Sequence, residues 1–148
     1  MYKCAIFDLD GTLADTITTI SYFANEALKK FNLKTYTEDE YKYMVGNGAK
    51  ILVERMLENQ NAYTKEMWEN VYTYYNKIYD ADFLYLTKPY DGIPELLSFL
   101  KEKGIKIGAL SNKPHYPTER ILESILKKIF LMKNSVREKA ILSNLTRQ

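Results

Sequence analysis

Cysteine and histidine are almost missing from this 148-residue sequence, which contains one of each, Cys4 and His115. A single cysteine excludes an intramolecular disulfide, and we expect Cys4 to pack within a first β-strand. A lone histidine with no second histidine or cysteine near it excludes a metal site built from those ligands at His115. We therefore interpret His115 as an exposed loop residue.

Long apolar runs are also missing. No segment approaches the roughly 20 apolar residues that a membrane-spanning helix needs, and the N-terminus has the pattern of a strand rather than of a cleavable signal. The composition, 46% hydrophobic over 148 residues, is sufficient for a core in one domain with an insertion or in two small domains. We therefore expect a cytoplasmic protein without a membrane partner.

The net charge of +2 is unevenly distributed along the chain. Residues 127–148 carry six basic side chains and a single acid, Glu138. A basic tail can bind nucleic acid or an anionic surface, but a solvated chain end is the more common explanation. We therefore expect no nucleic-acid partner.

Two acids, Asp8 and Asp10, lie where an apolar run over residues 2–9 meets Gly11. Side chains alternate along a strand, so the two share a face only if the strand stays extended between them. They would then lie at the strand's carboxyl end, where open α/β sheets bind ligands. Asp8 could attack a phosphoryl group to form an acyl phosphate, Asp10 could act as general acid and base, and Mg²⁺ would lie between them. An ordinary Asp-Gly turn is the alternative.

A second polar motif, Ser111-Asn112-Lys113-Pro114, follows an apolar segment over residues 105–110. If this segment is a strand that neighbours the first one, the serine hydroxyl and an exposed turn amide would lie beside the two acids. They would offer hydrogen bonds to a phosphate. Taken alone the motif is a plain turn; together with the first motif it indicates phosphate binding.

Between the two motifs, residues 15–85 are predicted to be almost entirely helical, with no strand. Apolar residues at three- and four-residue spacing indicate a first helix that begins near Asp15 or Thr16. Thr37 and Glu40 have the spacing of a capping box at the start of a short second helix.

The Val45-Gly46-Asn47-Gly48 segment ends that second helix, residues 49–57 form a third, and Thr64 caps a longer fourth one. Glycines beside an asparagine could let backbone amides approach an anion, and an ordinary break between helices is the alternative. Many of the thirteen tyrosines fall in this region. At helical spacing we expect them to pack against other helices rather than to stack on a substrate.

An α/β pattern resumes after the helical block. Pro94 suits the first turn of a helix whose predicted buried stripe is Leu96, Leu97 and Leu100. A core strand over residues 105–110 follows, and then a helix over residues 116–125. Strand, helical block, helix and strand together predict an α/β core, residues 1–14 and 86–148, with a helical domain, residues 15–85, inserted into it.

The string Phe-Asp-Leu-Asp-Gly-Thr-Leu-Ala-Asp-Thr, residues 7–16, resembles the haloacid dehalogenase superfamily of hydrolases, particularly its phosphoglycolate phosphatase-like branch. The resemblance implies a Rossmann-like core with a parallel sheet and an inserted α-helical cap. It implies that Asp8 is the nucleophile and a magnesium ligand, and that Asp10 is the acid/base and lends its backbone carbonyl to the metal. The residues that would bind phosphate are Thr12, Ser111, Asn112 and Lys113.

The sequence also departs from that family. A lysine on a later loop and an acidic metal motif are expected, but no aspartate follows Asp91. Lys113 could replace the lysine or be a solvated loop residue. From about Leu126 the resemblance fades, so we expect a truncated or frame-shifted chain with an incomplete sheet. Its first strand would have an unpaired edge, which allows self-association.

These observations predict a magnesium-dependent phosphomonoester hydrolase that acts on a small phosphorylated metabolite through an aspartyl-phosphate intermediate. Loss of the later motifs predicts weak metal binding and impaired activity. Two alternatives stay open: an inactive fragment that binds or dimerises through its helical insert and sheet edge, and a phosphomutase of the same family. Whether the chain is itself an active enzyme is left open by the sequence.

Overall fold

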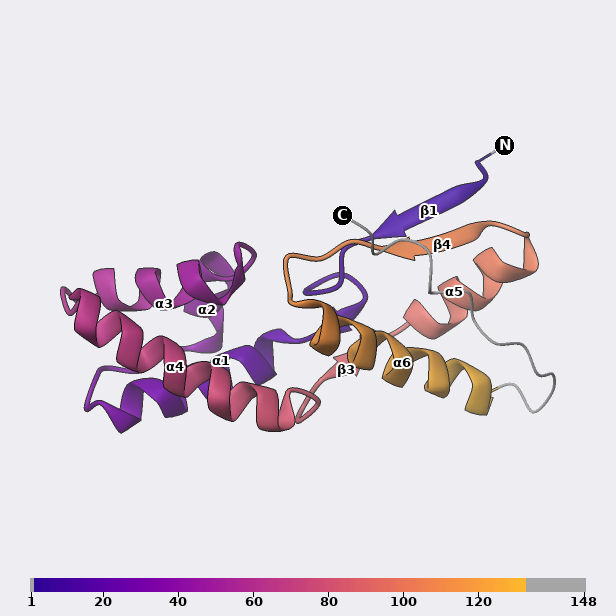
Figure 1. Ribbon diagram of the computed structural model, residues 1–148. Helices are drawn as coiled ribbons and strands as arrows, with labels where there is room; N and C mark the ends of the chain where they lie inside the picture. The colour runs from indigo at the N-terminus through magenta and orange to yellow at the C-terminus, as the bar shows by residue number, and fades with distance from the viewer. Residues whose placement is uncertain (1, 133–148) are drawn as a thin grey trace. The chain divides into compact units, whose positions relative to one another are not determined.

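The computed structural model describes residues 2–132, and its chain divides into two compact units. The core unit combines the residues up to Asp15 with those from Lys88 onward, and the helical unit is Thr16–Thr87. A helical segment is thus inserted in an α/β chain (Figure 1), which is the predicted fold class. None of the helices in the described residues is long and apolar enough to span a membrane.

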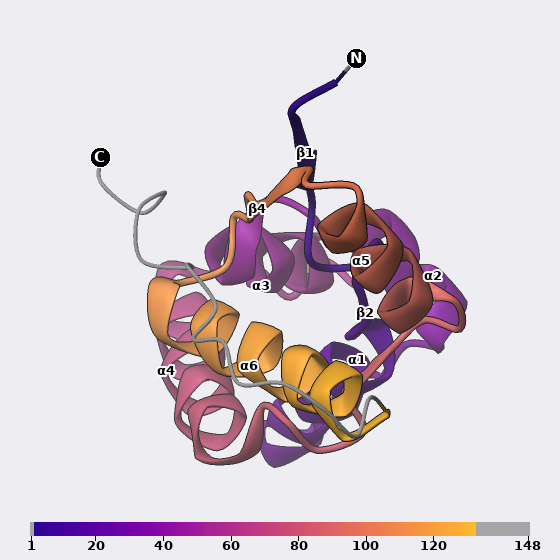
Figure 2. The same cartoon turned by 90° about the vertical axis from the view of Figure 1, so that its right-hand side faces the viewer.

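The core unit contains a two-stranded parallel sheet. Strand β1 (Cys4–Phe7) pairs with β4 (Lys106–Ala109), and the two strands lie side by side in both views (Figures 1 and 2). The expectation that the strands preceding the two polar motifs are neighbours is therefore confirmed. Parallel neighbours end at the same edge of a sheet, so this pairing brings the residues after β1 toward those after β4.

Strand β1 is shorter than the predicted strand over residues 2–9, because a tight turn begins directly after it. The Leu9 carbonyl accepts hydrogen bonds from the backbone amides of Leu13 at 3.1 Å and Ala14 at 3.0 Å. Gly11 has a φ of +76°, a left-handed conformation that glycine adopts at little cost. The strand is therefore not extended through Asp10; the turn, anchored by the fully buried Leu9, carries that residue.

Two helices pack within the core unit. Helix α5 (Ile93–Glu102) contacts β4 and α6 (His115–Met132). Their buried side chains include Leu97, Ile121 and Ile125. Helix α6 is longer than the predicted helix over residues 116–125 and begins at His115. That residue is exposed as expected, but it lies in the first turn of a helix and not in a loop.

Several hydrophobic residues of the core unit are more exposed than predicted. Leu96 of the expected buried stripe is 39% exposed, and Leu110 at the end of the expected core strand is 73% exposed. Cys4 is also exposed, so the prediction that it packs within the first strand is wrong. The physical reason is that the sheet has only two strands in the described residues, which leaves these side chains with few neighbours.

Two very short strands were missed by the sequence analysis. Strand β2 (Ala14–Asp15) pairs antiparallel with β3 (Lys88–Pro89). Two residues are too few to show the alternation by which strands are recognised. The chain leaves the core unit after β2 and returns to it at β3, so this pair joins the two connections to the helical unit.

The helical unit consists of α1 (Ile17–Lys30), α2 (Glu38–Met44), α3 (Gly48–Glu58) and α4 (Lys65–Asp82). Helix α4 packs against α1 and α3, and α1 also packs against α2. Tyr41 is fully buried and donates a hydrogen bond to Asn25 Oδ1 at 2.8 Å. Burial raises the pKa of the Tyr41 phenol, so this donor stays protonated. Tyr75 and Tyr79 are likewise buried, as expected for packing aromatics.

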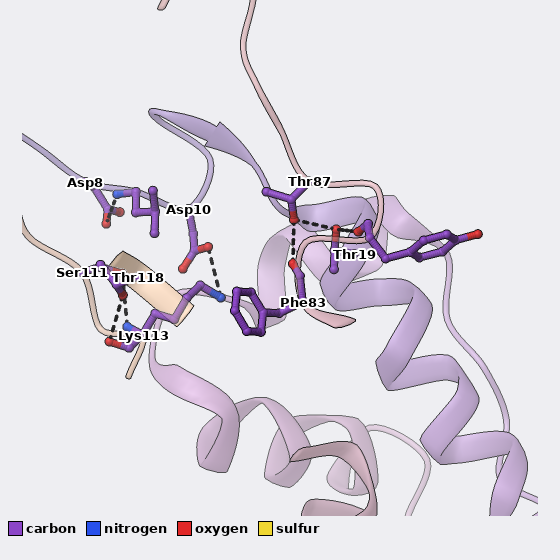
Figure 3. A network of polar contacts seen from close by, with 10 residues as sticks. Asp8, Asp10, Thr19, Phe83, Thr87, Ser111, Lys113 and Thr118 are labelled. Atoms are coloured by element: carbon purple, nitrogen blue, oxygen red, sulfur yellow. Dashed lines mark hydrogen bonds and ion pairs between the residues drawn. The ribbon is translucent and has the colours of Figure 1, made fainter. Parts of the chain in front are cut away.

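A hydroxyl cluster joins the first helix of the helical unit to the chain that follows α4 (Figure 3). Thr19 Oγ1 donates to the carbonyl of Tyr85 and lies 2.9 Å from Thr87 Oγ1. Thr87 Oγ1 in turn donates to the carbonyl of Phe83 at 2.9 Å. Thr19 is fully buried, so these bonds satisfy polar groups that water cannot reach.

The predicted helix caps are confirmed. Thr37 Oγ1 accepts a hydrogen bond from the Glu40 amide at 3.3 Å, and Glu40 Oε2 accepts one from the Thr37 amide at 2.7 Å. The bond from the Thr37 amide also lowers the pKa of the Glu40 carboxyl. Thr64 Oγ1 accepts from the Met67 amide at 3.1 Å at the start of α4.

Replacing Thr37 with Ala is expected to lower the free energy of unfolding by about 1 kcal/mol, because the Glu40 amide loses its capping acceptor. Urea denaturation followed by circular dichroism measures this change. Thr37→Ser is the matched control and should retain most of the stability, since the hydroxyl is kept. Equal loss in both variants would contradict the capping role.

Candidate functional site

Asp8 lies directly after β1 and is exposed. Its Oδ1 accepts a hydrogen bond from the backbone amide of Leu9 at 2.7 Å. This bond fixes the carboxylate against the turn that follows, because Leu9 itself is buried. The result is an accessible carboxylate in a fixed position at the carboxyl end of a strand.

Asp10 forms an ion pair with a residue from the second motif. Lys113 Nζ lies 3.4 Å from Asp10 Oδ1, and the two side chains are only 7% and 19% exposed, respectively. The alternative that Lys113 is a solvated loop lysine is therefore wrong. A shielded lysine next to a carboxylate places a positive charge at the site where a phosphate would add negative charge.

Ser111 organises the turn that carries this lysine. Its Oγ accepts a hydrogen bond from the Lys113 backbone amide at 3.1 Å, and Thr118 Oγ1 donates to the Lys113 carbonyl at 3.4 Å. A serine hydroxyl can accept and donate at the same time, so accepting from this amide leaves the Ser111 hydrogen available to a ligand.

Figure 3 shows Asp8, Asp10, Ser111 and Lys113 gathered at the ends of the paired strands β1 and β4. The structure therefore brings together four of the six residues predicted for the site. Thr12 and Asn112 are both exposed, and the Thr12 amide donates to the Leu9 carbonyl at 3.3 Å within the turn. Their assignment to phosphate binding stays a prediction.

The glycine-containing segment of the helical unit is fixed by an arginine. Arg55 donates one hydrogen bond to the Met44 carbonyl at 2.8 Å and another to Asn47 Oδ1 at 3.0 Å. Gly46 and Gly48 have φ values of +115° and +81°, which disfavour other residues there. The segment is thus held in one shape between α2 and α3, and its approach to an anion stays a prediction.

The acids of the site form a small set of possible ligands for a magnesium ion. No group of three or more histidine, cysteine, aspartate or glutamate side chains that could hold a metal exists within residues 2–132. Asp15, which belongs to no such group, has a buried Oδ1 without a hydrogen-bond partner in that part of the chain. Mg²⁺ is commonly held by one or two carboxylates together with phosphate and water, so Asp8 and Asp10 fit a minimal site of this kind.

The fold and the site together define an α/β protein with an inserted helical unit, in which two acids follow a strand and a serine and a lysine lie beside them. The sequence profile of haloacid dehalogenase-like hydrolases matches residues 5–135. The chain belongs to this family. The match continues past Leu126, where the resemblance was expected to fade, and residues 133–148 lie outside the described part of the structure.

Individual relatives agree with the family assignment. The phosphoglycolate phosphatase of Colwellia psychrerythraea is 33% identical over 124 residues, which cover 81% of this chain and 55% of that protein. The phosphoglycolate phosphatase of Aquifex aeolicus is 33% identical over 121 residues, covering 82% and 54%. The crystal structure of a predicted phosphoglycolate phosphatase from Haemophilus somnus matches with a TM-score of 0.77 at 27% identity, covering 83% and 57%. The chain therefore spans little more than half the length of these relatives.

Proposed function

We propose that this protein hydrolyses small phosphomonoesters, phosphoglycolate or a similar metabolite, in a magnesium-dependent reaction through an aspartyl-phosphate intermediate in the cytoplasm. The observation that carries the proposal is the accessible Asp8 carboxylate beside the shielded Asp10–Lys113 ion pair. The names of the relatives support the substrate class, because both are phosphoglycolate phosphatases.

In the first step an Asp8 carboxylate oxygen attacks the phosphorus atom, and the bond from phosphorus to the ester oxygen breaks. Asp10, protonated at that moment, gives its proton to the departing alkoxide, which leaves as an alcohol. In the second step Asp10 takes a proton from a water molecule as the water oxygen attacks phosphorus. The acyl-phosphate bond then breaks, inorganic phosphate leaves, and the Asp8 carboxylate is restored.

Ser111 and Lys113 bind the transferring phosphoryl group. The Ser111 hydroxyl donates to one phosphate oxygen while its Oγ keeps the Lys113 amide in place. The Lys113 ammonium turns from Asp10 toward the phosphate, which brings positive charge to the developing negative charge. Because Lys113 is already nearly buried, little of this charge is screened by water.

Magnesium would be held by the Asp8 carboxylate and the Asp10 backbone carbonyl. When bound, it supplies positive charge that offsets the repulsion between the carboxylates and a doubly negative phosphate. The described residues offer no third carboxylate for this site. We therefore propose that the metal binds weakly and that the activity is low.

Hydrolysis of a small phosphomonoester is expected to rise with magnesium concentration and not to saturate at physiological concentrations, since only two carboxylates gather at the site. A magnesium titration of the initial rate of phosphate release measures this dependence. Calcium at the same ionic strength is the control for non-specific salt effects. Saturation at low magnesium with fast turnover would contradict the proposed weak site.

A second candidate function is an inactive binding or dimerising module. It is favoured by the small number of metal ligands and by the exposed hydrophobic residues of the core unit. A folded protein that releases no phosphate at any magnesium concentration would support it.

A phosphomutase of the same family would instead transfer the phosphoryl group to a second sugar phosphate, which product analysis separates from hydrolysis.

A further inference from the structure

The pairing between β2 and β3 is too short to fix its own register. Ala14 lies opposite Pro89, and Asp15 lies opposite Lys88. Proline has no amide hydrogen to donate across a sheet, so two residue pairs that include Pro89 offer few backbone hydrogen bonds to oppose a slip. Contacts beyond these two pairs must therefore fix how β3 lies along β2.

The contact between the hydroxyls of Thr19 and Thr87 comes directly after these pairs along both segments of the chain. Thr87 immediately precedes β3, and Thr19 lies in the first turn of α1, the helix that follows β2. Their Oγ1 atoms are 2.9 Å apart. Thr19 is fully buried, and its hydroxyl also donates to the Tyr85 carbonyl. The contact thus ties the segment that enters β3 to the segment that leaves β2.

The backbone turn before β3 depends on this tie. The Thr87 amide donates to the Leu84 carbonyl at 3.1 Å and so closes the turn. Leu86, the third residue of the turn, has a φ of +62°, a conformation that glycine favours and leucine does not. The hydroxyl of Thr19 holds the Tyr85 carbonyl within this turn. Without that hydroxyl we expect the backbone before β3 to relax to a commoner conformation.

Strand β2, on the other side of the pairing, holds the turn that carries Asp10. The Ala14 amide donates to the Leu9 carbonyl at 3.0 Å, and the Ala14 carbonyl accepts from the Gly11 amide at 2.9 Å. Asp10 lies between Leu9 and Gly11 and forms a β-bridge with Ala14. A shift of β2 relative to β3 would therefore move both attachments of this turn and, with them, Asp10.

We propose that Thr19 is a positioning residue for Asp10. Its hydroxyl fixes the register of β3 on β2, and this register holds the turn that carries Asp10. Thr19 acts through the backbone and is not itself a catalytic group. The inference rests on the proposed function, in which Asp10 is the general acid and base. Ser111, which follows β4, is not held by this pairing, so loss of the Thr19 hydroxyl should weaken proton transfer more than phosphate binding.

Amide hydrogen exchange of the full chain, followed by NMR, tests the coupling without any need for hydrolysis. Thr19→Val keeps the shape of the side chain and removes the hydroxyl. The Ala14 amide should then exchange about tenfold faster, as expected when one hydrogen bond is lost. The Leu110 amide, which bonds to β1, should exchange at its original rate. Thr19→Ser should restore the slow exchange of Ala14.

Two further variants make the exchange experiment decisive. Ser21→Ala removes another buried hydroxyl of α1, one whose hydrogen bond lies within the helix, and should not change exchange at Ala14. Thr87→Val removes the other half of the contact at a half-buried position, and should accelerate exchange at Ala14 even if Thr19→Val does not fold. Unchanged exchange at Ala14 in the folded threonine variants, or equal acceleration in Ser21→Ala, would overturn the proposal.

The effect on the reaction is measured with two substrates that differ in their need for a proton. Phosphoglycolate releases an alcohol, which needs a proton from Asp10, whereas 2,4-dinitrophenyl phosphate releases a phenolate, which needs none. Thr19→Val should lower kcat/KM by up to about 10²-fold for phosphoglycolate, as for a displaced catalytic group, and much less for the dinitrophenyl ester. Partial unfolding would lower both values by the same factor, so equal losses would overturn the positioning role. If the unmodified protein hydrolyses neither ester, the proposed function fails, and exchange at Ala14 still decides whether Thr19 holds the turn.

Discussion

Replacing Asp8 with Asn is expected to reduce phosphate release to the background rate. The amide keeps the size of the side chain but loses the negative oxygen that attacks phosphorus. Removal of a catalytic nucleophile can cost up to about 10⁶-fold in turnover, so even a weak activity should become undetectable. The exposed position of Asp8 makes the substitution compatible with folding. Initial rates with a small phosphomonoester, at one high magnesium concentration used for both proteins, provide the measurement.

Asp91→Asn is the matched control for that experiment. Asp91 is also an exposed aspartate of the core unit, directly before a glycine, but it belongs to neither of the two polar motifs. The Asp91→Asn variant should release phosphate at the same rate as the unmodified protein. An Asp8→Asn protein that keeps a substantial fraction of the rate would show that hydrolysis proceeds without this carboxylate.

Replacing Lys113 with Met is expected to lower both turnover and stability. Loss of a fixed positive charge at the transferring group costs about 10²–10³-fold in turnover, by analogy with removal of an oxyanion-hole donor. It also leaves the mostly buried Asp10 carboxylate without its cation, at a cost of about 1–3 kcal/mol in the free energy of unfolding. Steady-state kinetics and urea denaturation measure the two effects separately.

Two comparison proteins make the Lys113 prediction specific. Lys106→Met removes an exposed lysine from β4 and should change neither the turnover nor the free energy of unfolding. The double variant Asp10→Asn/Lys113→Met should regain stability relative to Lys113→Met, because position 10 then carries no negative charge for the missing ammonium to balance, while its turnover stays low. The losses in the free energy of unfolding of the single variants Asp10→Asn and Lys113→Met can be added and compared with the loss in the double variant. If the two are equal, the Asp10–Lys113 ion pair does not contribute to folding.

The local features of this fold were predictable from the sequence, because each depends on residues close together in the chain. The capping box of Thr37 and Glu40 is one example. The helix breaks at Gly46 and Gly48 are another, since both have positive φ values. In these cases backbone geometry and side-chain chemistry over three or four residues determine where a helix begins or ends.

Burial in the core unit was less predictable. Leu96, Leu110 and Cys4 have the sequence pattern of core residues, yet all three are exposed. The spacing of apolar residues indicates which of them could be buried, but it does not indicate whether another helix or strand packs over them. The described sheet contains β1 and β4 alone, so these side chains have few neighbours.

The sequence predicted the residues of the candidate site, but not the contacts between them. The residue types at Asp8, Asp10 and Ser111 indicated phosphoryl chemistry, and pairing of β1 with β4 brings their loops to one edge. The role of Lys113 could not be decided from the sequence, because its ion pair with Asp10 joins residues about a hundred positions apart. Only the fold shows that this lysine is shielded.

Chemical trapping of the intermediate tests the central claim most directly. The full chain is incubated with magnesium and p-nitrophenyl phosphate and quenched with borohydride, which reduces an aspartyl phosphate to homoserine. Peptide mass spectrometry then locates the modification. We predict homoserine at position 8, dependent on both magnesium and substrate and absent from Asp8→Asn. Hydrolysis by the folded protein without modification at position 8, or a folded protein that shows neither hydrolysis nor modification, would contradict an aspartyl-phosphate mechanism at Asp8.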